Sequence, residues 1–123
     1  MDGRARAYLN GIDESLREDC AIIRERLMRG LIDAEEGFDH GFPVYYLKGK
    51  PVAGYACRKK GVMVYLMAPD IVAKHAVRLG GSLDGKGCIC VKRGSKPALP
   101  DVYEAIDEIL AEIRLEHTCG GYK

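Results

Sequence analysis

Three short runs of β-forming residues follow one another between residues 44 and 67, and they constrain the fold of this chain more than any other feature. The runs cover residues 44–47, 52–57 and 62–67, and a glycine-containing turn separates each run from the next. Short runs joined by such turns are typical of antiparallel strands that are neighbours in the chain. The sequence therefore predicts a three-stranded antiparallel meander.

Apolar side chains occupy both faces of these predicted strands. In the third run, one face carries Val62, Val64 and Leu66, and the other carries Met63, Tyr65 and Met67. An antiparallel sheet with one face in water usually alternates apolar and polar residues. We therefore expect helices to cover one face, and a helix, a second subunit or a ligand pocket to cover the other. The alternative is an ordinary core with partly exposed tyrosines.

Amphipathic helices are expected on both sides of the meander. Apolar residues recur every three or four positions from Leu16 to Leu31 and again from Val102 to Ile113. A shorter helix should follow Pro69, and residues 88–92 should form a fourth strand. This pattern predicts an α+β domain. Its antiparallel β-sheet has about four to five strands, with N- and C-terminal helices packed on it and a short helix inserted between strands.

The length of 123 residues predicts one domain that spans residues 1–123. The sequence shows neither a signal peptide nor an apolar run long enough to span a membrane, so we expect a cytoplasmic protein without a membrane partner. The five cysteines are odd in number and scattered along the chain, which argues against a disulfide framework. Three of them fall on predicted helix or strand faces, where cysteine packs as a small apolar residue.

Charge is distributed unevenly along the chain, although the net charge is only +1. Residues 44–96 contain eleven basic and two acidic residues, whereas the flanking segments contain eight basic and sixteen acidic residues. One interpretation is that the basic middle and the acidic ends neutralise each other. The other is a site for an anion on the middle or for a cation on the helices. Nucleic acid is not an expected partner, because the chain lacks both overall basicity and a recognised binding module.

Two groups of residues are candidates for binding sites. Tyrosines and lysines of the meander and of the glycine-rich segment 80–87 suit a small anionic ligand, because tyrosines provide apolar walls with polar tips. These are Tyr45, Tyr55, Lys60, Tyr65 and Lys86. Carboxylates and an imidazole that follow the first long helix suit a metal ion. These are Glu35, Glu36, Asp39 and His40. The alternative for this second group is a charged helix end and linker.

The order of motifs along the chain resembles the YdhG-like family. Two adjacent glutamates precede a Gly-x-Pro motif, a tyrosine strand, a Gly-Lys-x-x-x-Gly-Tyr strand, a Lys-Gly pair and a Leu-Pro helix start. The matching residues are Glu35, Glu36, Gly41, Pro43, Tyr45, Gly49, Lys50, Gly54, Tyr55, Tyr65, Lys86, Gly87, Leu99 and Pro100. Many members of this family are domains of unknown function, and some are labelled frataxin-like iron chaperones. The resemblance implies an α+β domain and no established reaction.

Three hypotheses about function follow. The first is a binding or carrier domain that uses a ligand pocket or a homodimer surface on the sheet, with a small anion or another protein as partner. The second is an iron-binding chaperone that uses acidic helix carboxylates, which makes iron the one cofactor that the resemblance implies. The third is an enzyme, and it ranks last because the sequence offers no nucleophile–base pair.

Overall fold

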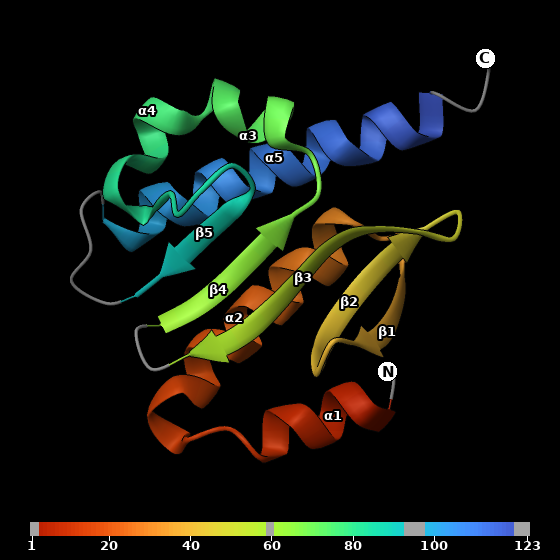
Figure 1. The fold of residues 1–123 in the computed structure, drawn as a ribbon, viewed down its shortest axis with the longest axis vertical. Helices are drawn as coiled ribbons and strands as arrows, with labels where there is room; N and C mark the ends of the chain where they lie inside the picture. The colour runs from red at the N-terminus through yellow and green to blue at the C-terminus, as the bar shows by residue number, and fades with distance from the viewer. Residues whose placement is uncertain (1–2, 59–60, 93–97, 120–123) are drawn as a thin grey trace.

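The computed structural model describes residues 3–58, 61–92 and 98–119. A five-stranded antiparallel sheet lies against helices from both ends of the chain (Figure 1). The strands are β1 (Glu35–Asp39), β2 (Phe42–Leu47), β3 (Lys50–Arg58), β4 (Gly61–Leu66) and β5 (Cys88–Val91). The helices are α1 (Gly3–Asn10), α2 (Glu14–Gly30), α3 (Pro69–Lys74), α4 (Ala76–Leu79), the 3₁₀ turn η1 (Gly80–Ser82) and α5 (Leu99–Cys119). The predicted α+β class and its arrangement are confirmed.

The strands pair in chain order, β1-β2-β3-β4-β5, and every pair is antiparallel. The predicted meander therefore corresponds to β2, β3 and β4, and the predicted fourth strand is β5. The first strand was not predicted, because its sequence is rich in acidic residues that rarely form strands. His40 and Gly41 join β1 to β2 with φ angles of 53° and 86°. Two successive left-handed residues are the geometry of a tight hairpin turn.

Helices α2 and α5 lie together on one side of the sheet, behind the strands in Figure 1. The apolar stripe of α5 is fully buried, as its periodicity predicts: Val102, Ile106, Ile109 and Ile113. Helix α2 contributes Cys20, Ile23 and Leu27 to the same core. The two helices pack closely, since a Cβ atom on Gly30 of α2 would lie 2.9 Å from the side chain of Leu110.

Basic residues of α3 and α4 pair with acidic residues of α5. Lys74 Nζ lies 2.9 Å from Glu112 Oε1, and Arg78 lies 2.9 Å from Glu108 and 3.2 Å from Glu104. Part of the basic middle of the chain therefore neutralises the acidic C-terminal helix. These contacts support the interpretation that the unequal charge distribution is mutually compensating in this region.

The cysteines are the main correction to the sequence interpretation. Cys20 of α2 and Cys57 of β3 form a disulfide bond, whereas the sequence argued against a disulfide framework and treated core-facing cysteines as small apolar residues. The two cysteines are 37 positions apart in the sequence, and this spacing does not indicate that the packing of α2 on the sheet brings them together. Cys88 and Cys90 are free thiols in β5.

In the described ranges, no helix is long and apolar enough to cross a membrane.

Two glycines with positive φ angles should differ in their tolerance of alanine. Both Gly49 and Gly61 have positive φ angles, 79° and 151°. A Cβ atom on Gly49 would meet nothing within 4 Å, but one on Gly61 would overlap the carbonyl oxygen of Val91. We expect Gly49→Ala to cost about 1 kcal/mol and Gly61→Ala about 2 kcal/mol or more. Urea unfolding of the two variants checks this order, and equal losses would contradict it.

Acid should weaken the packing of α3 on α5. Hydrogen bonds from His75 and Lys74 hold the pKa of Glu112 below its ordinary value of 4.5. A carboxyl group whose pKa is lowered by folding stabilises the folded state above its ordinary pKa, and this stabilisation disappears as the pH falls through the lowered value. The loss of thermal stability between pH 7 and pH 3 should therefore be smaller in Glu112→Gln than in the wild type.

The matched control for this prediction is Glu116→Gln, one turn further along α5. Glu116 is exposed and accepts no side-chain hydrogen bond in the described part of the chain. This variant should lose stability with acid as the wild type does. If both variants lose the same amount as the wild type, Glu112 has no special role.

Candidate functional site

The face of the sheet opposite α2 and α5 carries mainly apolar side chains, and we call it the open face. None of the described helices lies across this face in Figure 1. Strand alternation and register place the following residues on it: Phe42, Val44, Tyr46, Gly54, Ala56, Met63, Tyr65, Cys88 and Cys90. The larger ones, Phe42, Tyr46, Met63 and Tyr65, are only partly buried. The prediction that both faces are apolar is therefore confirmed for these strands.

Aromatic rings of the open face lie over glycines of the neighbouring strands. The ring of Phe42 stacks on that of Tyr65, with 5.1 Å between centroids. A Cβ atom on Gly54 would lie 3.2 Å from the Phe42 ring, and one on Gly37 would lie 3.0 Å from the Tyr46 ring. Because the glycines have no side chains, the rings of Phe42 and Tyr46 pack directly against the backbone of the neighbouring strands.

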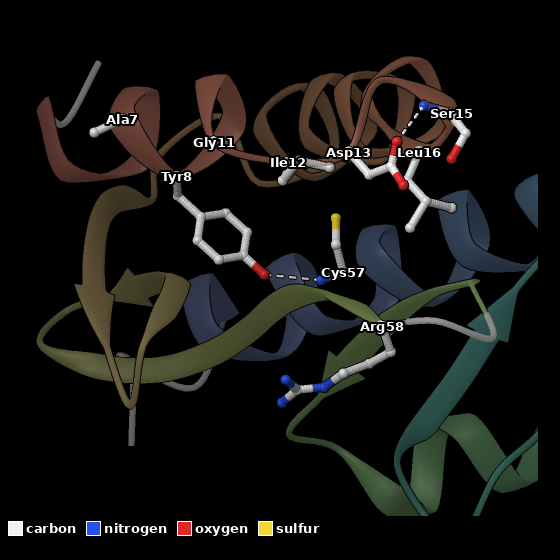
Figure 2. A pocket seen from close by; sticks show the side chains of 9 residues that line it. All are labelled: Ala7, Tyr8, Gly11, Ile12, Asp13, Ser15, Leu16, Cys57 and Arg58. Carbon is white, nitrogen blue, oxygen red and sulfur yellow. Dashed lines mark hydrogen bonds between the residues drawn. The ribbon is translucent and has the colours of Figure 1, made fainter.

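Charged residues border the open face with opposite signs at its two sides. Glu35 and Asp39 on β1 lie level with Tyr46 and Phe42 and are exposed. At the other side, Lys92 is exposed and follows Cys90 by two positions. Arg58 at the end of β3 is also exposed, and its side chain points away from α1 and α2 (Figure 2). The open face is thus acidic along β1 and basic at the β3 and β5 ends.

The predicted ligand residues are not gathered at one place. Tyr45 and Tyr55 are 1% and 0% exposed and belong to the core beneath the helices, while Tyr65 lies on the open face. Lys86 lines a separate cavity of about 370 Å³ beside α3. Lys60 lies outside the described residues. The reason for the split is strand parity, because the core-facing positions of β2 and β3 include Tyr45 and Tyr55.

Tyr45 and Tyr55 differ in their polar contacts inside the core. The Tyr45 hydroxyl donates a 2.6 Å hydrogen bond to Glu36 Oε2, and Arg24 of α2 binds both oxygens of the same carboxylate at 2.9 and 3.0 Å. Burial and this hydrogen bond raise the pKa of Tyr45. Among the described residues, the buried Tyr55 hydroxyl has no hydrogen-bond partner, and burial likewise raises its pKa. Both phenols therefore remain neutral at physiological pH.

The predicted metal ligands lie on and beside β1, and they do not point to the same side. Glu36 faces the core and is bound by Arg24 and Tyr45, while Glu35 and Asp39 face the other way. His40 occupies the hairpin turn, where its backbone N–H donates to Asp39 Oδ1. Among the residues described, no group of three or more histidines, cysteines and acids is arranged to hold a metal ion.

A further cavity, of about 590 Å³, lies between the α1–α2 turn and the end of β3 (Figure 2). Its walls include Tyr8, Ile12, Asp13, Leu16 and Cys57. The Cys57 N–H donates a 2.8 Å hydrogen bond to the Tyr8 hydroxyl. Sequence reasoning did not identify this cavity, because its walls come from segments about 50 residues apart. The single hint was that Cys20 and Cys57 both fall on core-facing positions.

Comparison with known proteins gives one informative structural match. No family model and no curated protein matches the sequence. The fold is similar to the crystal structure of a protein from the DUF1801 family, YdhG, from Bacillus subtilis. The two share 15% sequence identity with a TM-score of 0.69, over 89% of this chain and 86% of the other. At this identity the match shows a common fold, which is the fold that the YdhG-like resemblance implies.

Replacing Tyr45 and Tyr55 by phenylalanine should give opposite results. Tyr45→Phe removes a hydrogen bond to a charged carboxylate, and we expect a loss of about 2 kcal/mol of unfolding free energy. Tyr55→Phe removes only an unpartnered hydroxyl, so stability should stay within about 0.5 kcal/mol or increase. Chemical denaturation of the two variants measures the difference. A larger loss in Tyr55→Phe would show that its hydroxyl has a partner.

Proposed function

We propose that this chain is a small binding domain without catalytic activity, and that the open face is its contact surface. The observation that carries the proposal is the set of partly exposed apolar side chains that the described helices leave uncovered. Contiguous apolar surface of this kind marks interaction sites in soluble proteins. The fold shared with a DUF1801 protein supports the assignment to uncharacterised YdhG-like domains. The cytoplasm remains its expected location.

We further propose that the occupant of the open face is a second copy of the same chain. The argument is charge complementarity, because the face is acidic along β1 and basic at the C-terminal ends of β3 and β5, where Arg58 and Lys92 lie. Asp84, beside Cys88, is at the opposite end of β5. A two-fold axis parallel to β3 would put the β1 side of one copy over the β5 side of the other. Asp39 would then lie over Cys90 of the second copy, two positions from Lys92, and the aromatic rings would meet near the centre. Such an interface has an apolar core and a charged rim.

A small ligand on the open face is the competing outcome. The tyrosine and lysine set predicted for an anion does not assemble there, since Tyr45 and Tyr55 are in the core. An apolar ligand between the rings of Phe42 and Tyr65 would require the two stacked rings to separate. Both facts favour association between copies over ligand uptake.

Iron handling, which the resemblance implies, remains a prediction of lower rank. One of its four candidate residues, Glu36, already binds Arg24 and Tyr45. Ferrous iron titrated under anaerobic conditions against wild-type protein and a Glu35→Gln, Asp39→Asn double variant would test it directly.

The interface proposal predicts a dimer that charge reversal disrupts and then restores. Sedimentation velocity at micromolar concentrations should show dimers of the wild type. Asp39→Lys and Lys92→Glu should each weaken association by about threefold to tenfold, because each places like charges together at the rim. The double variant should recover most of the loss. Tyr65→Glu should abolish association by burying a charge at the centre.

The matched control is Val77→Glu, which changes an apolar residue of α4 that is 96% exposed and lies away from the open face. This variant should remain dimeric. A wild-type protein that is monomeric at all concentrations overturns the proposal. So does a dimer that Val77→Glu weakens as much as Tyr65→Glu. A monomer that takes up an apolar dye in a Tyr65-dependent way would point to a ligand instead.

A further inference from the structure

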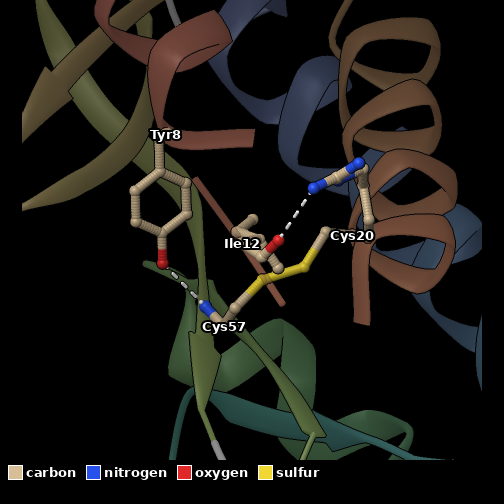
Figure 3. The surroundings of a disulfide bond; sticks show 5 residues. Tyr8, Ile12, Cys20 and Cys57 are labelled. Atoms are coloured by element: carbon tan, nitrogen blue, oxygen red, sulfur yellow. Dashed lines mark hydrogen bonds between the residues drawn. A yellow bond between two sulfur atoms is a disulfide. The ribbon is translucent and has the colours of Figure 1, made fainter. Parts of the chain in front are cut away.

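The two residues of the Cys20–Cys57 disulfide are unequally buried. Cys20 lies on the inner face of α2 and is 0% exposed. Cys57 is only partly buried and forms part of the wall of the 590 Å³ cavity. Figure 2 shows its side chain directed from β3 toward the α1–α2 turn, and Figure 3 shows its bond to Cys20 on α2. A molecule in this cavity would therefore reach the disulfide from the Cys57 side.

The cavity has the size and lining of a small-molecule site. Its volume falls within the range of roughly 300–1,000 Å³ that is usual for ligand pockets. Ala7, Ile12 and Leu16 provide apolar surface, and Tyr8, Asp13 and Ser15 provide polar groups. The Tyr8 hydroxyl accepts the Cys57 N–H, and Arg17 donates to the Ile12 carbonyl oxygen at 3.2 Å. These hydrogen bonds hold the cavity walls next to the disulfide.

We propose that Cys20–Cys57 is a thiol–disulfide exchange site whose reaction partner is a low-molecular-weight thiol bound in this cavity. The thiol loses its proton, and its sulfur attacks the Sγ atom of Cys57. A new sulfur–sulfur bond forms to Cys57 while the Cys20–Cys57 bond breaks. The electron pair of the broken bond goes to Cys20 Sγ, which takes up one proton, so the products are a mixed disulfide on Cys57 and a Cys20 thiol.

The same geometry sets the direction of exchange. Attack must occur at the sulfur that the incoming thiol can reach, and this is Cys57. Cys20 is the leaving group, and its position in the core keeps it close to Cys57 for the reverse reaction. The cavity provides the room that an adduct on Cys57 needs. The free thiols of β5 lack this arrangement, since Cys88 and Cys90 are not bonded to a partner and do not line the cavity.

Single-cysteine variants separate the two sulfurs. The background should carry Cys88→Ser, Cys90→Ser and Cys119→Ser, so that only the pair remains. On this background, Cys20→Ser leaves Cys57 as a thiol, and the matched control Cys57→Ser leaves Cys20. Folded protein is incubated with glutathione disulfide, and intact mass is followed with time. We expect Cys57 to gain one glutathionyl group at least about tenfold faster than Cys20, because thiol reactivity follows exposure. Equal rates, or faster reaction at Cys20, overturn the proposal.

A second measurement uses the intact disulfide and needs no substitution in the pair. The background protein is treated with reduced glutathione without denaturant, quenched with acid and digested for peptide mapping. The adduct should be found on the Cys57 peptide. An adduct on the Cys20 peptide, or reduction that occurs only after denaturation, would show that the cavity does not admit the thiol. This result is independent of whether Cys20→Ser folds.

Discussion

Burial of one face of the meander beneath α2 and α5 is the interaction on which the rest of this structure depends. Residues from both ends of the chain meet there, and the packing decides which residues of each strand face the core. Tyr45 and Tyr55 enter the core, and alternate residues of the same strands, such as Val44, Gly54 and Ala56, are left on the other side. The helices pack on one face only, but by selecting the residues that face them they also determine which residues lie on the open face. Both the proposed interface and the free β5 thiols follow from that choice.

Much of the fold could be predicted from the sequence, because most of its helices and strands have the local periodicity of apolar residues that is typical of those elements. The stripe from Val102 to Ile113 and the three runs of the meander have the periods of a helix and of strands, and the structure confirms them. The strand at Glu35–Asp39 could not be found this way. Its formation depends on pairing with β2 and on the bond between Glu36 and Arg24, neither of which is a local property.

The candidate sites were harder to predict than the fold. The candidate tyrosines lie near one another in the sequence, but Tyr45 and Tyr55 face the core and Tyr65 faces the open side. Which face each tyrosine occupies depends on strand parity and register, which a list of residues does not contain. The Cys57 cavity is a stronger example, since Tyr8 and Cys57 become neighbours only when α1 packs on the sheet. The Cys20–Cys57 disulfide was not predicted, for the same reason. Cysteine spacings in a sequence indicate disulfides when several cysteines form a characteristic set. A single disulfide between a helix and a strand has no characteristic spacing.

The acidic composition of β1 also bears on aggregation. β1 is an edge strand, so one row of its backbone N–H and C=O groups is not paired within the sheet. Unpaired edges invite strands of other molecules, and short length and charge are two features that discourage such pairing. β1 has five residues, and three of them are acidic. The acidic residues that made this strand hard to predict from the sequence thus also discourage edge-to-edge pairing with other molecules and the formation of fibrils.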